Sequence, residues 1–364
     1  MVFAMSLPSL LRTALTLLGA LLAAELCVWL HTPIPWMLGP LLLTAFASMA
    51  GLPTRSSGRL RNLGQWTIGA ALGLYFTPQV GALVLNLWWA IALGIVWALG
   101  LGWGFGLWLQ RRHRTDLGHL GTHRLRATSY FAGAIGGASE MTLLSERIGA
   151  RTDLVAAAHS LRLVMVVISV PFAMQWAQSR WGLQVDASLR STSRAAEWPG
   201  LLWVAGITLA GAWLMIRLRR ANPWFMGALL ATMLLSLSGQ FWSAIPTPMS
   251  NAAQLFIGVS LGVRFQREFL HTAPRWLGSV AIGTTFMLGV SVLFGWAMAE
   301  LVGQHPATLI LGTSPGGIAE MAITAKVLQL GVPVVTAFQV CRLVAVLVLV
   351  APLFDWLERK GHLA

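Results

Sequence analysis

The sequence has few charged residues. Only 10% of its 364 residues are Asp, Glu, Lys or Arg, whereas soluble domains carry about 25%, and 56% are apolar. Too few charges remain to cover a surface that faces water, which excludes a soluble enzyme or a free transcription factor. Together with a mean hydropathy of +0.70 and several apolar runs of about 20 residues, this scarcity predicts an all-α, polytopic membrane protein.

Lysine and cysteine are scarce too. Lys326 and Lys360 are the only lysines, so arginine supplies nearly all of the positive charge behind the net charge of +13. In a membrane protein, such an excess of arginine more often marks the loops on the cytoplasmic side than a surface that binds nucleic acid. Cys27 and Cys341 stand in apolar stretches near opposite ends of the chain, so neither a disulfide framework nor a Cys-x-x-Cys metal site is predicted.

Four short motifs occur twice, in the same order and at nearly the same offset. The pairs are 35–42 with 223–230, Gln65, Gly69 and Gly73 with Gln254, Gly258 and Gly262, 136–141 (GGASEM) with 316–321 (GGIAEM), and 162–164 with 342–344 (Arg-Leu-Val in both). The offsets lie close to half the chain length, so we infer an internal duplication. It divides the chain into a first repeat at 1–176, a linker at 177–198 and a second repeat at 199–364.

Each repeat has six apolar segments that could enter a membrane. In the first repeat they are 12–30, 36–51, 62–76, 82–109, 127–149 and 153–176, and in the second 199–216, 224–242, 249–263, 276–300, 306–329 and 333–356. Glu25 interrupts the first segment, and no convincing cleavage site follows it. We therefore interpret this segment as a retained helix rather than a signal peptide.

Arginine alternates between the loops, and the alternation has opposite phase in the two repeats. The basic loops are 51–61 and 110–126 in the first repeat and 217–220 and 264–275 in the second, while the loops at 31–35, 77–81, 243–248 and 301–306 contain no arginine. Because cytoplasmic loops are enriched in Lys and Arg, the two repeats are predicted to lie in opposite orientations. Inverted repeats are typical of secondary transporters.

The inversion constrains the number of crossings. Three apolar segments separate the basic loops at 110–126 and 217–220, although both loops should be cytoplasmic, so one segment must return to its own side. Segment 127–149 and its counterpart 306–329 are rich in glycine and carry several charges. We predict that both are re-entrant hairpins, which gives ten crossings, a periplasmic linker and two cytoplasmic termini. A broken helix that does cross, giving twelve, is the alternative.

A Gly-Gly-x-x-Glu-Met element stands in each predicted hairpin, at Gly136, Gly137 and Glu140 and again at Gly316, Gly317 and Glu320. Glycine pairs let the backbone leave helical geometry, which at membrane depth requires burial in protein or a wet cavity. In the second copy, Ser314 and Pro315 suggest a helix cap followed by proline at the first helical position. Free N–H groups there would favour an anion. The alternative is a tight turn between packed helices.

Arg162 and Arg342 stand within apolar stretches, and each follows its glutamate at the same spacing along the chain. A charge at membrane depth needs a partner or a water-filled cavity. Either the arginines form internal ion pairs with Glu140 and Glu320 that clamp the hairpins, or they hold an anionic substrate while the carboxylates take up a proton or cation. His159 and its repeat partner Gln339 precede the arginines by one helical turn and so share their helix faces. His159 is a proton-sensitive group or a hydrogen-bonded structural one.

Two further patterns favour structure over chemistry. Gly69 and Gly73, like their counterparts, form small-residue faces for helix packing. The histidines at 113, 119 and 123 are loosely spaced like metal ligands, but the surrounding arginines repel cations. We therefore expect a solvated cytoplasmic loop there, with no metal and no cofactor.

These motifs resemble a known family. Two diverged copies, each with a Pro-x-x-Leu-Gly-Pro-Leu-like start and a Ser-Pro-Gly-Gly element before an arginine-bearing helix, look like the AbrB-duplication family. These bacterial inner-membrane proteins carry labels such as aidB regulator and ammonia monooxygenase, and they are distinct from the soluble Bacillus regulator of the same name. The first copy has Ala134 and Ile135 where the motif has Ser and Pro. The resemblance therefore implies an asymmetric site dominated by the second hairpin.

Three functions follow from these features. A secondary transporter or exporter of a small anionic organic solute accounts for the inverted repeats, the broken segments and the buried charges together. A membrane-embedded regulator of gene expression without direct DNA contact is the alternative. An oxygenase would need a metal centre, and the histidines at 31, 159, 271 and 305 are scattered, so we expect no enzyme activity. The expected partners are the bilayer and a small solute or ion, with no nucleic acid, and a homodimer is left open.

Overall fold

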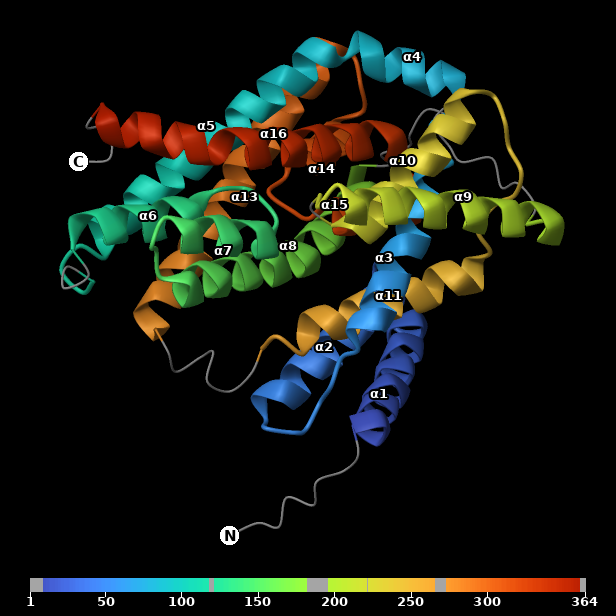
Figure 1. Ribbon diagram of the computed structural model, residues 1–364, viewed down its shortest axis with the longest axis horizontal. Coiled ribbons are helices and arrows are strands. Elements are labelled where there is room, and N and C mark those ends of the chain that lie inside the picture. The colour runs from blue at the N-terminus through green and yellow to red at the C-terminus, as the bar shows by residue number, and fades with distance from the viewer. Residues whose placement is uncertain (1–8, 118–120, 182–195, 221, 266–272, 361–364) are drawn as a thin grey trace. The chain divides into compact units, whose positions relative to one another are not determined.

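We describe a computed structural model of the chain that covers residues 9–117, 121–181, 196–220, 222–265 and 273–360 (Figure 1). All regular structure in these ranges is helical, which confirms the all-α prediction. The helices are α1 (Ser9–Trp29), α2 (Pro35–Met49), α3 (Gly58–Gly73), α4 (Pro78–Asn86), α5 (Trp88–Arg112), α6 (Thr122–Gly133), α7 (Ala138–Arg147), α8 (Thr152–Trp181), α9 (Trp198–Arg217), α10 (Pro223–Leu237), α11 (Thr247–Gly262), α13 (Pro274–Val302), α14 (Pro306–Thr313), α15 (Ile318–Val327) and α16 (Val332–Arg359).

Six of the described helices are long and apolar enough to cross a membrane: α1, α5, α8, α9, α13 and α16. Helices α3 and α4 together form one more apolar stretch, but it is bent by 89° at the break between them. Helices α2 and α10 are apolar but have only 15 residues, about 22 Å against a hydrocarbon core of about 30 Å. The chain is thus a multi-pass membrane protein, and the number of ten crossings remains a prediction.

The chain folds into two compact units, and each unit takes helices from both predicted repeats. Unit 1 comprises residues 1–79 and 191–269, and unit 2 comprises 80–190 and 270–364. Within the described ranges, unit 1 contains α1 to α3 and α9 to α11, and unit 2 contains α5 to α8 and α13 to α16. The two compact units therefore do not coincide with the two sequence repeats at 1–176 and 199–364. Most of the predicted linker, residues 182–195, lies outside the described ranges.

Glycines hold the helices of unit 1 together in two matching crossings. A Cβ on Gly69 of α3 would lie 2.4 Å from the carbonyl oxygen of Phe225 on α10, and one on Gly258 of α11 would lie 2.5 Å from that of Met37 on α2. Gly73 and Gly262 make the same approach one turn later. Such backbone contact requires the missing side chain, so the Gly-x-x-x-Gly pairs serve helix packing, as predicted.

Helices α6 and α7 fold back on each other in unit 2. At the base, the Arg151 N–H before α8 donates to Thr128 Oγ1 of α6 (2.9 Å), and at the tip Arg162 of α8 donates to the carbonyl oxygen of Ala134 (2.7 Å). Helix α6 therefore runs alongside α8 in the same direction, and α7 leads the chain from the tip back to the base. The pair is a hairpin, in agreement with the predicted re-entrant element.

Helices α14 and α15 form an equivalent hairpin in the second repeat. The Gly331 N–H before α16 donates to Thr308 Oγ1 of α14 (3.2 Å), and Arg342 of α16 donates to the carbonyl oxygen of Gly316 (2.6 Å). The same types of donor and acceptor thus mark the base and the tip in both copies. The motifs that recur at a constant offset in the sequence therefore form the same helical hairpin twice in the structure.

The two hairpins enter unit 2 from opposite ends of α16. The base of the second hairpin lies at Gly331, while the first hairpin meets the other end of α16, where Tyr130 Oη donates to the carbonyl oxygen of Val350 (2.9 Å) and His123 contacts Glu358. The tips meet between these ends, near Arg342. Figure 1 shows α8 and α16 running in opposite directions. In unit 2 the two copies are therefore inverted relative to each other.

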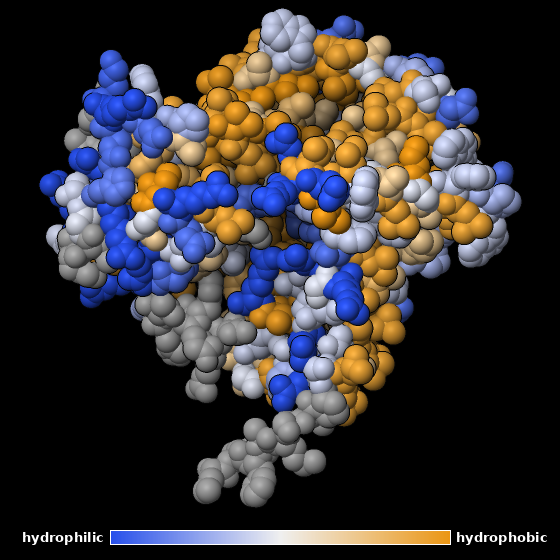
Figure 2. Space-filling view, in the orientation of Figure 1, coloured by the Kyte–Doolittle hydropathy of each residue, from blue (hydrophilic) through white to orange (hydrophobic). Residues whose placement is uncertain are grey.

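The surface of unit 2 agrees with membrane insertion. Phe286, Ile282 and Val96 are apolar side chains that are 65–68% exposed. In the view of Figure 2, hydrophilic residues gather at the left over the ends of α5, α6 and α16, away from the orange apolar surface. A large exposed apolar face on a polytopic helical protein is the face that lipid covers.

Candidate functional site

Each hairpin tip is a short break in extended conformation. The breaks begin at Ala134 (φ −53°, ψ 139°) and Ser314 (φ −61°, ψ 144°), and they end at Gly137 (φ −67°, ψ 140°) and Gly317 (φ −79°, ψ 154°). The first N–H of each break still donates to the preceding helix, from Ala134 to Tyr130 and from Ser314 to Ile310, but the carbonyl oxygens at the end of that helix have no following helical turn to donate to them. They must be satisfied by side chains from elsewhere.

The predicted cap at Ser314 and Pro315 was placed wrongly. Helix α15 begins at Ile318 with Gly317 as its N-cap, not at Pro315. Ser314 instead follows the last residue of α14, and its hydroxyl donates to the carbonyl oxygen of Ile310 (2.6 Å). A residue before proline is restricted to extended conformations, so Pro315 ends α14 rather than starting the next helix.

The paired glycines of both tips provide space rather than an unusual backbone conformation, since none of the four has a positive φ. A Cβ on Gly136 would lie 2.6 Å from the methyl group of Met141, and one on Gly316 would lie 2.8 Å from Met321 Cγ. A Cβ on Gly137 or Gly317 would collide with the carboxylate of the same motif, Glu140 or Glu320. The Gly-Gly-x-x-Glu-Met pattern is thus one packing unit in which Met and Glu fold over the glycines.

Arg162 holds the first tip through main-chain carbonyls. Its guanidinium donates to the carbonyl oxygens of Gly133 (3.2 Å) and Ala134 (2.7 Å) and also to His159 Nδ1 (2.7 Å). The other ring nitrogen of His159, Nε2, lies 2.9 Å from the carbonyl oxygen of Phe131. Since a carbonyl only accepts and a guanidinium only donates, His159 must be the neutral tautomer with its proton on Nε2. This geometry favours the structural interpretation of His159.

Arg342 and Gln339 hold the second tip in the same way. Arg342 donates to the carbonyl oxygens of Ser314 (2.5 Å) and Gly316 (2.6 Å), and Gln339 Nε2 donates to those of Leu311 (2.8 Å), Gly312 (3.2 Å) and Ser314 (3.2 Å). One buried atom of each of these two side chains has no hydrogen-bond partner among the described residues, namely Arg342 Nε and Gln339 Oε1. The second tip therefore keeps one donor and one acceptor unused, whereas Arg162 and His159 pair with each other.

The arginines do not clamp the hairpins through the predicted ion pair in the first copy. Among the described residues no ion pair joins Arg162 to Glu140. Arg162 and Arg342 lie where the carbonyl oxygens of α6 and α14 run out, which is the negative end of each helix dipole. The clamp that the sequence suggested exists, but its acceptors are main-chain carbonyls.

Glu140 and Glu320 occupy the opposite end of each break. Each is the third residue of its helix, α7 or α15, and its carboxylate folds back against the N-cap glycine. A carboxylate there lies at the positive end of the helix dipole. At each break, the negative end of the first helix thus faces a buried arginine, and the positive end of the second helix faces a buried or half-buried glutamate.

All twelve predicted site residues lie in unit 2, at the two tips: Gly136, Gly137, Glu140, His159, Arg162, Ser314, Pro315, Gly316, Gly317, Glu320, Gln339 and Arg342. The two tips lie close together along α16: Arg342 holds the second tip, and the first tip follows Tyr130, which bonds to the carbonyl oxygen of Val350 two turns farther along the same helix. One small region of unit 2 therefore holds two buried cations, two carboxylates and four helix ends.

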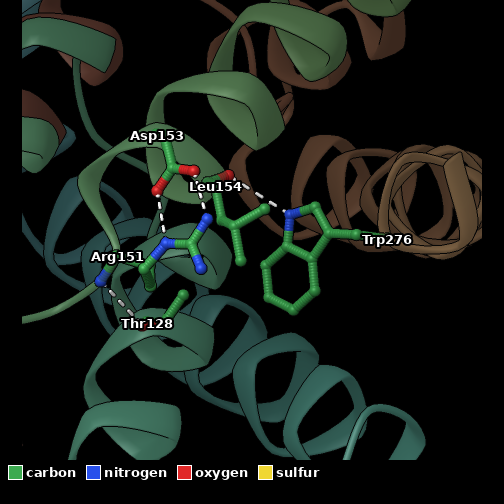
Figure 3. A network of polar contacts seen from close by, with 5 residues as sticks. All are labelled: Thr128, Arg151, Asp153, Leu154 and Trp276. Carbon is green, nitrogen blue, oxygen red and sulfur yellow. Dashed lines mark hydrogen bonds and ion pairs between the residues drawn. The ribbon is translucent and has the colours of Figure 1, made fainter. Parts of the chain in front are cut away.

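The base of the first hairpin carries polar contacts that the sequence analysis missed (Figure 3). Besides the bond from the Arg151 N–H to Thr128, the Arg151 guanidinium binds Asp153 through two hydrogen bonds (2.8 and 2.5 Å), and Trp276 Nε1 donates to the carbonyl oxygen of Leu154 (3.2 Å). Thr128 has its counterpart in Thr308, at the same offset as the two Gly-Gly-x-x-Glu-Met elements. That recurrence was a signal that could have identified both threonines.

The histidines near residue 113 differ from expectation at one position. His113 is buried, with its Nε2 2.9 Å from Ser279 Oγ, whereas a solvated loop was predicted. His119 lies outside the described residues, and His123 is exposed. In the part of the chain that the structure describes, no three His, Cys, Asp or Glu side chains are placed to hold a metal ion.

Comparison with known proteins places this architecture in a family. The model of the family described as transition state regulatory protein AbrB matches residues 36–358, which include most of each repeat and both hairpins. The chain belongs to the AbrB family. The resemblance inferred from the duplicated motifs is thereby confirmed.

Two relatives share most of their length with this AbrB-family chain. It is 25% identical over 349 residues to "Uncharacterized protein YhjN" of Bacillus subtilis (strain 168), covering 89% of this chain and 88% of that protein. It is 21% identical over 323 residues to "Putative regulator AbrB" of Escherichia coli (strain K12), covering 87% of this chain and 88% of that protein. The family match thus extends over most of both units.

Proposed function

We propose that this AbrB-family protein is a secondary transporter of a small organic anion, which binds where the two hairpin tips meet. The observation that carries the proposal is the pair of inverted hairpins whose tips meet beside two buried arginines. Breaks at membrane depth, buried charges and inverted repeats are the parts from which secondary transporters build their central sites. Movement of unit 2 against unit 1 would expose this site to each side in turn.

The second hairpin is the proposed contact for the anion. Arg342 Nε and Gln339 Oε1 are buried without partners among the described residues. The Arg342 N–H can donate to an anionic oxygen, whereas Gln339 Oε1 only accepts and would bind a hydroxyl or N–H group of the same solute. The N-terminal end of α15 adds a positive dipole that favours an anion. Glu320 competes for that end, because its own carboxylate lies against Gly317.

This competition couples the anion to protons in our proposal. A carboxylate that takes up a proton loses its attraction to the helix end, and an incoming anion then gains that electrostatic stabilisation. Binding of one anion would accompany binding of a proton to Glu320. The protein would therefore carry the anion and the proton in the same direction.

Binding to purified protein and uptake into proteoliposomes test this proposal. A panel of small carboxylates and organic phosphates is screened by thermal shift, and the hits are then followed into vesicles. Glu320→Gln should bind a hit more tightly and with little dependence on pH, while Arg342→Gln should bind and transport it at least tenfold less well. The matched control is Glu146→Gln, an exposed glutamate on α7. Wild-type pH dependence in Glu320→Gln would contradict the coupling, and wild-type uptake by Arg342→Gln would contradict the anion site.

Regulation of gene expression is the second candidate, since the family description and the name of the Escherichia coli relative refer to a regulator. In that function a solute bound at the tips would be sensed rather than moved, without direct contact between this chain and DNA. Transcription measured in cells that carry Arg342→Gln separates the two functions. Changed transcription with unchanged solute levels favours the sensor.

The proposal includes a location and an orientation. We place the protein in a bacterial inner membrane with both termini in the cytoplasm, because the four basic loops at 51–61, 110–126, 217–220 and 264–275 then face the cytoplasm. Cysteines introduced into loops 51–61 and 243–248 should react with an impermeant label from opposite sides. Labelling from one side would contradict the inversion of unit 1.

A further inference from the structure

An open apolar groove of about 770 Å³ runs between α5 and α13 of unit 2. Its α5 wall includes Val96, Gly100 and Gly104, and its α13 wall includes Ile282 and Phe286. The two helices are antiparallel, since Trp97 stacks on Phe294 with ring centroids 4.3 Å apart while Phe105 lies against Gly283. The end of α5 therefore lies beside the start of α13.

Arginines continue both walls beyond the same end of the groove. Arg111 follows Gly104 by two helical turns, and Arg275 precedes Ile282 by two turns, so each lies on the groove-lining face of its helix. Arg112 has the same relation to the lining residue Phe105. All three are exposed, and Asp116 lies 3.5 Å from Arg275. Three cations against one carboxylate leave an excess of positive charge there.

We propose that this groove is a binding site for one anionic phospholipid, with an acyl chain between α5 and α13 and the phosphate on Arg111, Arg112 and Arg275. The lining from Leu93 to Trp108 spans about 22 Å, which exceeds the depth of one leaflet of a core about 30 Å thick. Trp108 lines the groove at its charged end, where tryptophan is favoured at the membrane surface. Basic side chains at that level attract anionic headgroups.

The charges favour a lipid over a second copy of the chain. Two copies in one membrane have the same orientation, so pairing through this groove would bring both sets of arginines to the same level and close together. Like charges there would repel. An anionic headgroup removes that repulsion, and its chain covers the exposed Ile282 and Phe286.

Two pairs of matched variants test the site in the full-length detergent-purified protein. Arg111→Gln, Arg112→Gln and Arg275→Gln are combined, and the control combines Arg217→Gln, Arg219→Gln and Arg220→Gln at the end of α9. Gly104→Leu fills the groove, because nothing lies within 4 Å of a Cβ at this position. Gly206→Leu is its control, with the same open space on α9 of unit 1 and outside the groove lining.

The readouts are native mass spectrometry and thermal shift with dioleoyl phosphatidylglycerol or dioleoyl phosphatidylcholine. We expect phosphatidylglycerol to stabilise the wild type more than phosphatidylcholine, with binding weakened about a hundredfold in the triple groove variant and lost in Gly104→Leu. Both controls should bind as the wild type does. Equal effects of the two lipids, unchanged binding in either groove variant, or conversion of a dimer to a monomer by Gly104→Leu would each overturn the proposal. None of these outcomes depends on transport.

Discussion

The two hairpins of unit 2 share the same set of stabilising contacts, but they differ in whether all buried polar atoms at the tip have hydrogen-bond partners. In both, a threonine at the base, an arginine at the tip and a carboxylate against a glycine recur at equivalent positions of the repeat. In the first hairpin, Arg162 donates to His159 as well as to the carbonyls. In the second, Arg342 Nε and Gln339 Oε1 have no partner among the described residues.

This difference separates structural from functional demands on the same residues. The contacts that both copies keep, from arginine to carbonyl and from glutamate to helix end, satisfy a broken helix wherever it occurs. The copies diverge at His159 against Gln339 and at Ala134-Ile135 against Ser314-Pro315. We expect function to depend on the positions where the second copy leaves buried polar atoms unpaired and the first copy pairs them.

Removal of either tip arginine should have the largest effect on stability. Arg162→Leu removes the donor to the carbonyl oxygens of Gly133 and Ala134. Arg342→Leu removes the donor to the carbonyl oxygen of Gly316, while that of Ser314 keeps its bonds from Gln339 and the Gly316 N–H. An unsatisfied buried group costs about 1–3 kcal/mol. We expect a loss in the free energy of unfolding of about 2–5 kcal/mol for Arg162→Leu and about 1–3 kcal/mol for Arg342→Leu, measured by denaturant titration in detergent. Arg217→Leu, at the exposed end of α9, is the control and should change that free energy by about 0.5 kcal/mol at most.

The two arginine variants also sharpen the comparison. Arg162 donates to His159 Nδ1 in addition to carbonyl oxygens. Arg162→Leu should therefore leave this buried ring nitrogen without a donor as well, and it should be the more destabilising of the two variants. Arg342→Leu should have the larger effect on ligand binding. Equal stability and equal binding in both variants would contradict the asymmetry between the hairpins.

Much of this arrangement could be predicted from the sequence because it depends on local pattern. The duplication, the re-entrant segments and the clustering of Arg162 and Arg342 with the glycine pairs follow from repeats and from the cost of charge at membrane depth. The glycine pairs were found for an incomplete reason. Their backbone needs no special φ, and what they provide is room for Met141 and Glu140, which no local pattern shows.

The remaining features depend on tertiary contacts. Arg162 was predicted either to pair with Glu140 or to hold an anionic substrate. Its guanidinium on α8 instead reaches the free carbonyls at the end of α6, and their position depends on where that helix stops. The division of the chain into two units also could not be predicted from the sequence. Each repeat contributes three of the described helices to unit 1, and Gly69 of one repeat packs on Phe225 of the other, a partnership between segments in opposite halves of the sequence.

An exchange of the diverged pair should have a moderate effect. His159→Gln converts the first tip to the donor set of the second, because a Gln amide can still donate to the carbonyl oxygen of Phe131. We expect a stability loss of about 1 kcal/mol, since one buried hydrogen bond to Arg162 changes. Gln339→His should cost more, because the amide donates to three carbonyls and a ring nitrogen cannot. Thermal shift on both variants measures the order, and the reverse order would contradict this account.

A pH-dependent difference at the bases should be the smallest effect. His305 begins the second hairpin, and its Nδ1 accepts a hydrogen bond from the Ala307 N–H (3.3 Å), while the first hairpin has Leu125 at the equivalent position. Burial lowers the pKa of His305 below its ordinary value of 6.5. The unfolded chain therefore binds more protons than the folded one near that pH, so this contribution to stability is present above pH 6.5 and is lost as the pH falls.

Hydrogen exchange of α14 and α6 tests the difference in one sample. After correction for the intrinsic exchange rate, protection of the α14 amides should decrease between pH 7.5 and 5.5 relative to that of α6. His305→Asn should remove this relative change, because asparagine keeps an N-cap acceptor that does not titrate. If α14 and α6 lost protection in parallel in both proteins, the hairpins would be equivalent at their bases, and their asymmetry would be confined to the tips.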